Sequence, residues 1–350
     1  MAAPVPLVTA PGEIAAIARD PAWLAHRYDE TADAVHVVRL DRAGHARVTF
    51  VTDEHLPPDA ARRAVPRAGM VAAAPAPGPI HFIFHSAYCL STLAARAMDI
   101  PGVAMGLKEP QILNDMIGWR HRGGHPNQVA RVLDESLRLL ARPFGAGEAV
   151  IVKPSNVVNP LARAMLAMRP DARALLLYAP LPTYLASIAK KGMWGRLWVR
   201  ELFGKLRAEG LVSLGFDDAQ LLGQTDLQIA ALGWLGQHRL FAALAAALPG
   251  RVRTLSSAGL TARPAEAVRG MGALFGLGLD GAAVAAIVAG PAFTSHSKGG
   301  ARFDAAARAR EHADAAAVHA DEITKVAVWG EAVARANGIA MDPGAGLLAS

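Results

Sequence analysis

The sequence is poor in cysteine and in charged residues, and it lacks a long uninterrupted run of apolar residues. Cys89 is the single cysteine among 350 residues, so no internal disulfide can form. We therefore expect a protein of a reducing compartment, the cytoplasm, and not a disulfide-stabilised secreted fold. Charged residues make up 19% of the chain and hydrophobic residues 52%, which excludes a flexible, solvated chain and is sufficient for a large buried core.

No apolar run is long enough to cross a membrane. The most apolar stretch, residues 227–248, is interrupted by Gln237, His238 and Arg239. A spanning helix needs about 20 nearly uncharged residues, because a charged group in hydrocarbon costs several kcal/mol. The N-terminal residues also lack a basic segment ahead of an apolar one. We expect no membrane span and no signal peptide.

A small excess of basic residues is the main electrostatic feature. Lys and Arg number 36 against 30 for Asp and Glu, and the net charge of +6 favours anionic partners. The densest basic region consists of Lys190, Lys191, Arg196, Arg200, Lys205 and Arg207. We interpret it as a solvated helix face with Trp194 and Trp198 packed inward, and a small anionic ligand is the alternative. Nucleic-acid binding would be better supported by a basic stripe interleaved with aromatic residues, so no nucleic-acid partner is predicted.

The first 78 residues differ in pattern from the rest of the chain. We predict a small N-terminal element in which a helix covers residues 12–27 and a β-hairpin joins 35–40 to 46–52. Residues 55–79 are rich in proline and alanine and have no clear period, which indicates a surface connection. Residues 1–78 and 79–350 are therefore predicted to be separate parts of the protein.

From residue 80 onward, short apolar runs alternate with helical patterns. The predicted strands cover residues 80–84, 103–107, 149–152, 174–178 and 251–255. Buried strands that alternate with helices indicate a parallel sheet with helices on both faces. We predict the α/β class, a three-layer domain with a central, mostly parallel sheet and a largely helical C-terminal part.

Ligands of such sheets bind beyond the carboxyl ends of the strands, where four short polar segments fall. These segments are residues 85–92, 108–110, 153–156 and 179–181. The first leads from a strand into a helix, whose free N–H groups favour an anion, and Ser91 could alternatively serve only as the helix cap. The Walker A pattern G-x-x-x-x-G-K-S/T occurs nowhere, so ordinary ATP or GTP chemistry is not predicted.

No set of residues has the spacing of a metal site. His312 and His319 lie seven residues apart in a helical pattern, which places them about 10 Å apart along the helix. That separation is too long for both to bind one metal ion without a third element. We expect no metal cofactor.

The order of these segments resembles a sulfotransferase of the P-loop superfamily over roughly residues 79–335. In that family a loop of the type P-K/R-S-G-T-T holds the 5′ end of 3′-phosphoadenosine 5′-phosphosulfate, and residues 87–92 occupy that place here. The resemblance implies that the cosubstrate is bound by Ser86, Tyr88, Cys89, Leu90, Ser91 and Thr92.

Further positions follow from the same resemblance. Glu109 matches the residue that serves as base in many members of the family. Ser187 matches the serine that follows the strand in the 3′-phosphate motif, and residues 274–277 are similar to the family's F-L-G-L turn. Lys298 and Gly299 lie where the family often has a basic, glycine-containing segment that closes over the nucleotide.

Two positions depart from the family pattern. Tyr88 stands where the family has a loop Lys or Arg, and Ala179 where it has the arginine of the 3′-phosphate site. Each missing charge-assisted contact would be worth about 1.5–3 kcal/mol. Lys153, at the end of the third predicted strand, is our candidate for the replacement charge, with Lys190, Lys191 and Lys298 as alternatives.

The resemblance implies transfer of a sulfuryl group from 3′-phosphoadenosine 5′-phosphosulfate to a small acceptor with a hydroxyl or amine. Glu109 would accept the proton of the acceptor, and Lys153 would supply positive charge. The alternative is a catalytically silent relative that binds a ligand or a protein. A nucleotide-dependent kinase is a third possibility, which the missing loop lysine disfavours.

Overall fold

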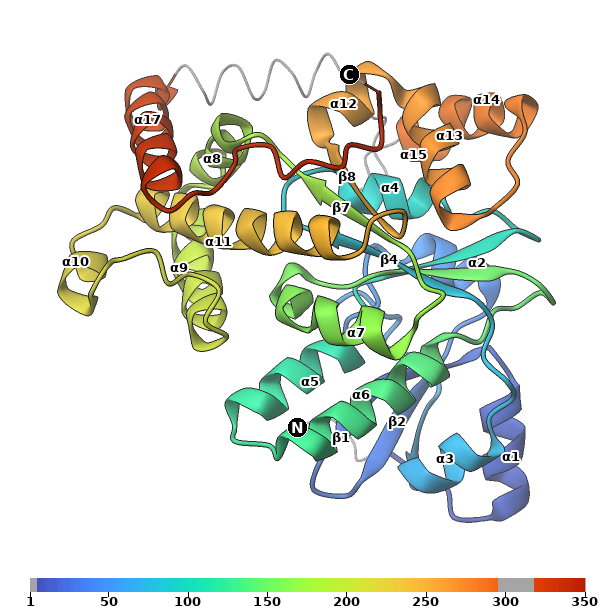
Figure 1. Ribbon diagram of the computed structural model, residues 1–350. Helices are drawn as coiled ribbons and strands as arrows, with labels where there is room; N and C mark the ends of the chain where they lie inside the picture. The colour runs from blue at the N-terminus through green and yellow to red at the C-terminus, as the bar shows by residue number, and fades with distance from the viewer. Residues whose placement is uncertain (1–4, 295–317, 350) are drawn as a thin grey trace. The chain divides into compact units, whose positions relative to one another are not determined.

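The computed structural model describes residues 5–294 and 318–349 (Figure 1). The chain divides into two compact units. Unit 1 comprises residues 1–83 and 94–173, and unit 2 comprises residues 84–93 and 174–350. The predicted division at residues 78 and 79 into separately acting parts stays a prediction.

A three-stranded antiparallel sheet with the order β1-β2-β3 forms the N-terminal part of unit 1. Its strands are β1 (Trp23–Asp29), β2 (Ala34–Arg39) and β3 (Arg62–Pro66). Helices α1 (Pro11–Arg19) and α3 (Arg67–Ala73) pack against each other beside it. The predicted helix was thus too long, because residues 23–27 belong to β1, and the predicted connection contains β3 and α3.

The predicted hairpin between residues 35–40 and 46–52 is wrong. Residues 42–47 form the helix α2 (Arg42–Arg47), because the side chain of Asp41 accepts a hydrogen bond of 2.6 Å from the amide of Gly44. An aspartate used in this way caps a helix instead of turning a hairpin. The antiparallel partner of β2 is β1, which precedes it.

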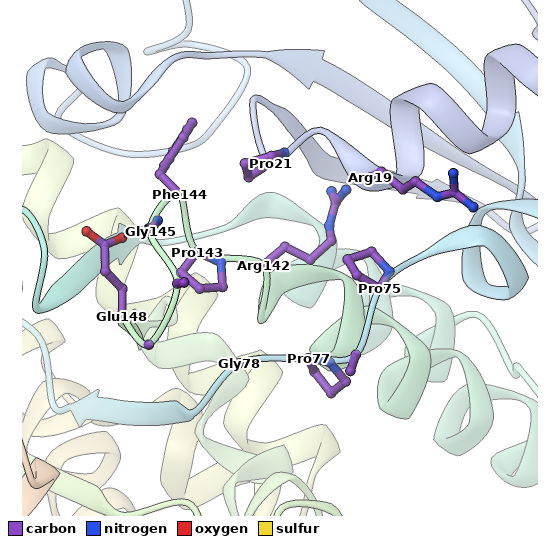
Figure 2. A pocket seen from close by; sticks show the side chains of 13 residues that line it. Arg19, Pro21, Pro75, Pro77, Gly78, Arg142, Pro143, Phe144, Gly145 and Glu148 are labelled. Carbon is purple, nitrogen blue, oxygen red and sulfur yellow. Dashed lines mark hydrogen bonds between the residues drawn. The ribbon is translucent and has the colours of Figure 1, made fainter.

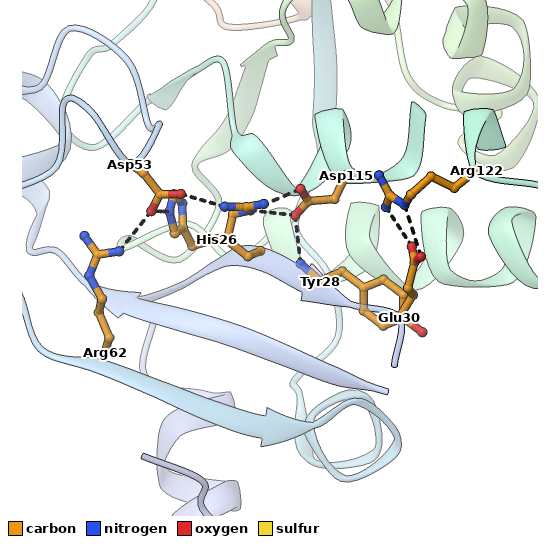
Figure 3. Close-up of polar contacts among 8 residues, drawn as sticks. His26, Tyr28, Glu30, Asp53, Arg62, Asp115 and Arg122 are labelled. Carbon is orange, nitrogen blue, oxygen red and sulfur yellow. Dashed lines mark hydrogen bonds and ion pairs between the residues drawn. The ribbon is translucent and has the colours of Figure 1, made fainter. Parts of the chain in front are cut away.

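Ion pairs tie this sheet to helix α5 (Gln111–His121), as Figure 3 shows. The guanidinium Nε of Arg27 lies 2.9 Å from Asp115 Oδ2, and the amide of Tyr28 donates to the same oxygen over 2.9 Å. Asp53 accepts from Arg27, from Arg62 and from the buried ring of His26, whose Nε2 lies 2.8 Å from Oδ1. The sheet and α5 therefore share one polar network within unit 1.

The parallel strands follow in the order β5-β6-β4-β7-β8, and the structure confirms the α/β class. They are β4 (Ile80–His85), β5 (Ala104–Lys108), β6 (Ala149–Lys153), β7 (Ala174–Tyr178) and β8 (Val252–Ser256). The first four residues of β4, with β5 and β6, belong to unit 1, and β7 and β8 belong to unit 2. Every residue of β4 to β7 is buried, which explains why continuous apolar runs predicted these strands well.

Helices flank these strands in both units. Along the chain, the segment that joins β4 to β7 contains α4 (Ser91–Ala97), α5, α6 (Pro126–Leu140), η1 (Asn156–Leu161) and α7 (Ala162–Met168). Unit 2 adds α8 (Leu181–Lys190), α9 (Gly192–Ala208), α10 (Asp218–Leu222), α11 (Asp226–Ala247), α12 (Ser257–Ala262), α13 (Pro264–Phe275), α14 (Gly281–Ala289), α15 (Pro291–Thr294) and α17 (Ala320–Ala336).

The most apolar stretch of the sequence is the helix α11. Thr225 begins it with a capping box: its side chain accepts from the amide of Gln228, whose own side chain accepts from the amide of Thr225. Most residues of the helix are buried, including Gln237 and His238. None of the helices in the described residues is long and apolar enough to cross a membrane.

Most of the basic region of unit 2 lies on the helix α9, where the structure corrects one expectation. Trp198 is half-buried, but Trp194 is 60% exposed, with Met193 and Leu197 equally open beside it. The prediction that both tryptophans pack inward is therefore wrong for Trp194. The inward positions of α9 are filled by Val199, Leu202, Phe203 and Leu206.

Candidate functional site

The loop that follows β4 has an unusual backbone. Ala87, Tyr88 and Leu90 have φ angles of 72°, 51° and 68°, in the left-handed region that glycine normally occupies. In turns that contain left-handed residues, successive backbone N–H groups can point toward one concave site for an anion. The loop leads directly into α4, where the N–H groups of a first helical turn have no acceptor within the helix.

Contacts within unit 2 hold this loop beside β7. The amide of Ser86 donates to Leu177 O over 3.1 Å, and the thiol of Cys89 donates to the same carbonyl over 3.3 Å. The amide of Ala87 donates to Nδ1 of His85 over 3.1 Å. Cys89 is fully buried, so it serves as a packing residue that ties the loop to the strand.

The hydroxyl of Ser86 in this loop is buried without a hydrogen-bond partner among the described residues. A buried hydroxyl without a partner costs about 1–3 kcal/mol, so native proteins rarely keep one without a reason. A ligand oxygen bound in the loop would satisfy this group.

Tyr88 belongs to a row of aromatic residues and supplies no positive charge. Its ring centroid lies 5.4 Å from that of Trp198 and 6.2 Å from that of Tyr184 on α8. Burial raises the pKa of its hydroxyl well above the usual value, so the side chain is neutral. Packing on two helices therefore takes the place of the cation that the sequence resemblance expects here.

Ser187 lies on α8, one turn after Tyr184. It is buried, and its hydroxyl donates to the carbonyl of Thr183 over 2.9 Å, which leaves oxygen lone pairs to accept. The arginine that the resemblance expects in this region is replaced by Ala179. This residue is buried, and its carbonyl accepts from Trp234 Nε1 over 2.9 Å. The rings of Tyr88 and Tyr184 connect the loop to α8.

In unit 1, Glu109 and Lys153 form an ion pair at the ends of two neighbouring strands. The ammonium of Lys153 donates to Oε1 of Glu109, and the amide of Glu109 donates to the carbonyl of Lys153 over 2.6 Å. Lys153 is fully buried and lies 5.0 Å from the ring centroid of Phe50. Glu109 has a φ of 56°, so a left-handed turn directs its carboxylate to the lysine.

The sequence analysis places Lys108 in a strand-end segment but assigns it no role; it is a second buried lysine in register with Lys153. Its ammonium donates to the carbonyls of His45 over 2.8 Å and Ala46 over 3.2 Å, in the last turn of α2. Burial lowers the pKa of Lys108 to about 8. The sequence shows that Lys108 directly precedes Glu109. Its burial was not predicted, because lysine side chains at strand ends are normally exposed.

Two of the predicted residues, Lys298 and Gly299, lie outside the residues that the structure describes. Ser86, Tyr88, Cys89, Leu90, Ser91, Thr92 and Ser187 belong to unit 2, whereas Glu109 and Lys153 belong to unit 1. The part of the chain described contains no cluster of His, Cys, Asp or Glu that could hold a metal ion.

Unit 1 also contains a pocket of about 260 Å³ before the amino ends of β4 and β6 (Figure 2). Its buried cation, Arg142, donates to the carbonyls of Leu139, Ala18 and Trp23. Two of these carbonyls belong to the last turns of α6 and α1, where a cation is stabilised by the negative end of the helix dipole. Arg142 is thus a structural residue whose donors are engaged, and we assign no ligand to the pocket.

Comparisons with known proteins give weak similarities only. No protein-family model and no curated protein matches the sequence. The sulfotransferase domain from the curacin biosynthetic pathway is 15% identical with a TM-score of 0.39, covering 63% of this chain and 81% of that chain.

Sulfotransferase STF1 from Mycobacterium tuberculosis H37Rv is also 15% identical, with a TM-score of 0.37 and coverage of 62% and 72%. For the sulfotransferase domain from the Synechococcus PCC 7002 olefin synthase the identity is 15%, the TM-score 0.35 and the coverage 63% and 80%. Similarity at this level assigns no family or activity to the chain, so the function proposed below rests on its own residues and on the sequence resemblance.

Proposed function

We propose that the chain is a sulfotransferase-like enzyme that transfers the sulfuryl group of 3′-phosphoadenosine 5′-phosphosulfate to a hydroxyl or amine of a small acceptor. The observation that carries the proposal is the left-handed backbone at Ala87, Tyr88 and Leu90. Leu90 stands where the family motif has glycine, the residue that takes this conformation without strain. The left-handed backbone at Leu90 thus supports the proposal that the loop binds an anion although its sequence lacks the glycine.

The loop is assigned to the phosphosulfate end of the cosubstrate. Transfer of a sulfuryl group needs positioning and charge stabilisation more than covalent participation by the protein. The amides of residues 88–92 and the hydroxyls of Ser91 and Thr92 would donate to its oxygens, and the buried hydroxyl of Ser86 would gain a partner. Ser187, with Lys298 and Gly299, is assigned to the rest of the nucleotide on the basis of the sequence resemblance.

Glu109 and Lys153 are assigned to the acceptor and to the transferred group. Glu109 would accept the proton that the acceptor loses as its oxygen or nitrogen attacks sulfur. Once protonated, Glu109 no longer neutralises the ammonium of Lys153, whose charge is then available to the sulfuryl oxygens. In this way, transfer of the proton to Glu109 would make the charge of Lys153 available as negative charge develops in the transition state.

The direct test is transfer from sulfur-labelled cosubstrate to a panel of phenols, alcohols and amines. Glu109→Gln should lower kcat by about 10²–10⁴-fold, the usual contribution of a general base. Glu331→Gln, an exposed carboxylate on α17, is the matched control and should leave kcat unchanged. Transfer that is undiminished in Glu109→Gln would refute the assigned role of Glu109.

Removing one partner of a buried pair also affects folding, so a second variant is needed. Glu109→Gln leaves the buried ammonium of Lys153 without its carboxylate and should lower the free energy of unfolding. The double variant Glu109→Gln/Lys153→Met removes both charges and should recover much of that stability. A recovery of folding without a recovery of transfer attributes the lost activity to chemistry.

The second candidate function is a catalytically silent relative that binds a ligand through the same loop. The neutral, packed Tyr88 and the buried Ala179 favour it, because both stand where the family carries a cation. Under this alternative the protein binds adenosine 3′,5′-bisphosphate but transfers no sulfuryl group to any acceptor of the panel.

A further inference from the structure

The segment that follows α2 lies against the turn that carries Glu109. The amide of Val51 donates to the carbonyl of Lys108 over 2.7 Å, and the amide of Gln111 donates to the carbonyl of Val51 over 3.2 Å. Val51 is fully buried and is thus bonded to the backbone on both sides of Glu109. Phe50, which directly precedes Val51, is therefore held beside this turn.

A second set of contacts orients the half-buried ring of Phe50. The ring of His55 packs against it in an edge-to-face arrangement, with centroids 5.0 Å apart and planes 83° apart. Thr52 holds His55, because its hydroxyl lies 2.9 Å from Nδ1 of His55 and its carbonyl accepts from the amide of His55 over 3.0 Å. The ring of Phe50 therefore has a defined orientation in the folded chain.

The ammonium of Lys153 has few partners for a buried cation. It carries three N–H donors, and within the described part of the chain its hydrogen bond goes to Glu109 alone. Its other contact is with the ring of Phe50, whose centroid lies 5.0 Å away. An aromatic face attracts a cation most strongly where water is excluded, and Lys153 is fully buried. The carboxylate and the ring thus hold this ammonium together.

The two contacts differ in their effect on the charge of Lys153. A carboxylate neutralises the ammonium, whereas an aromatic ring carries no net charge and takes up no proton, so it attracts the ammonium and leaves the positive charge in place. When Glu109 accepts a proton, as proposed above, the ammonium loses its ionic partner. The contact with Phe50 then remains and keeps the ammonium in position.

We infer that Phe50 is a positioning residue, which holds the ammonium of Lys153 in place during the step in which Glu109 is protonated. The inference rests on the proposed function, because that function assigns the proton to Glu109 and the stabilising charge to Lys153. Phe50 acts through Lys153 and needs no contact of its own with either substrate. Residues 1–78 thus contribute to the proposed site through Phe50.

The kinetic test compares Phe50→Leu, which keeps an apolar side chain but removes the aromatic face, with Phe50→Tyr, which retains the face. Phe50→Leu should lower kcat about tenfold and leave KM for both substrates unchanged, because the contact acts only as the proton is transferred. Phe50→Tyr should retain most of the wild-type kcat. Phe144→Leu changes a half-buried phenylalanine of the same unit, which packs on His45, and is the matched control that should keep the wild-type kcat.

A second measurement does not depend on transfer. Trace labelling of the full chain with acetic anhydride, followed by digestion and mass spectrometry, gives the rate at which Lys153 is acetylated, with the exposed Lys325 on α17 as internal reference. Phe50→Leu should raise this rate several-fold, because the ammonium loses a contact and the smaller side chain opens the ion pair to the reagent. Phe50→Tyr and Phe144→Leu should be labelled at Lys153 as the wild type is.

The outcomes distinguish the role of Phe50 from the function on which it rests. Circular dichroism first establishes that each variant is folded. No transfer by the wild type to any acceptor would refute the proposed function and the kinetic role of Phe50 with it. The role of Phe50 alone is overturned if Phe50→Leu raises KM while kcat is unchanged, if Phe50→Tyr loses as much kcat as Phe50→Leu, or if Lys153 is labelled equally fast in Phe50→Leu and the wild type.

Discussion

Left-handed backbone at residues other than glycine marks the two segments that the proposed function uses. Four of the six such residues in the described chain are Ala87, Tyr88, Leu90 and Glu109. Each costs roughly 1 kcal/mol or more, because Cβ crowds the carbonyl oxygen in this conformation. Strain that collects in one loop and at one carboxylate is consistent with the roles proposed for them.

The first prediction concerns this strain. Ala87→Gly should raise the free energy of unfolding by about 0.5–1 kcal/mol, because glycine removes the clash while adding some entropy to the unfolded chain. Ala87→Val should lower it, since a β-branched residue tolerates a φ of 72° poorly. Urea unfolding followed by circular dichroism measures both. Equal stability of the glycine and valine variants would contradict the strain.

A second prediction at this scale concerns two buried histidines. His45 and His238 are fully buried, and neither ring has a hydrogen-bond partner among the described residues. Burial lowers the pKa of each to about 3, below the unfolded value of about 6.5. The unfolded state therefore binds more protons between these pH values, and stability falls as the pH drops from about 6.5 toward 3.

Each histidine should contribute a slope of up to about 1.4 kcal/mol per pH unit within that range. His238 lies between aromatic rings, with its centroid 3.4 Å from Trp234 and 4.9 Å from Tyr178. His238→Phe should therefore remove about one histidine's share of the slope while it retains the aromatic packing. Measurement of unfolding free energies at several pH values checks this, and an unchanged slope in His238→Phe would contradict it.

At the scale of secondary structure, polar side chains at the ends of helices and strands determine the local structure where the hydrophobic pattern fits more than one. The strands from β4 to β8 were predicted to within one residue at each end, because a buried parallel strand is a continuous apolar run. The N-terminal part was predicted less well, because the sequence around Asp41 and Gly44 suits both a hairpin turn and a capped helix. The cap depends on the carboxylate of Asp41 accepting a hydrogen bond from the amide of Gly44, which the hydrophobic pattern does not reveal.

Arg142 shows how one side chain joins several elements. It donates to the last turn of α1, to the last turn of α6 and to the start of β1. Arg142→Met should lower the free energy of unfolding by about 2–4 kcal/mol, because buried carbonyls at two helix ends lose their donors. Arg19→Met, an exposed arginine of the same pocket, should cost less than about 0.5 kcal/mol. Chemical unfolding of both variants tests the difference.

An ion pair of the network in Figure 3 can be compared with an exposed ion pair on α17. Asp115 is nearly buried and receives both Arg27 and the amide of Tyr28, whereas Asp321 pairs with Lys325 on an exposed helix face. Asp115→Asn should cost about 1–2 kcal/mol and Asp321→Asn less than about 0.5 kcal/mol. Similar costs for the two substitutions, measured by urea unfolding, would show that the network adds nothing to the stability of unit 1.

At the scale of the whole molecule, the sequence could indicate the class of fold and the segments of the site, but not its chemistry. Strand ends pointed to Glu109, Lys153 and the loop at 85–92, because ligands of parallel sheets bind there. The ion pair of Glu109 with Lys153 depends on a left-handed turn, and the engaged donors of Lys108 depend on the end of α2. Both arise from tertiary contacts that no local pattern encodes.

Isothermal titration calorimetry tests the claim that the loop after β4 binds the phosphosulfate nucleotide of a sulfotransferase. The protein is titrated with adenosine 3′,5′-bisphosphate and, separately, with ATP and magnesium. We predict saturable binding of the bisphosphate, weaker or no binding of ATP, and loss of affinity in Ser86→Ala, which removes the buried hydroxyl. No binding of the bisphosphate at millimolar concentration, or a clear preference for ATP with magnesium, would contradict the claim.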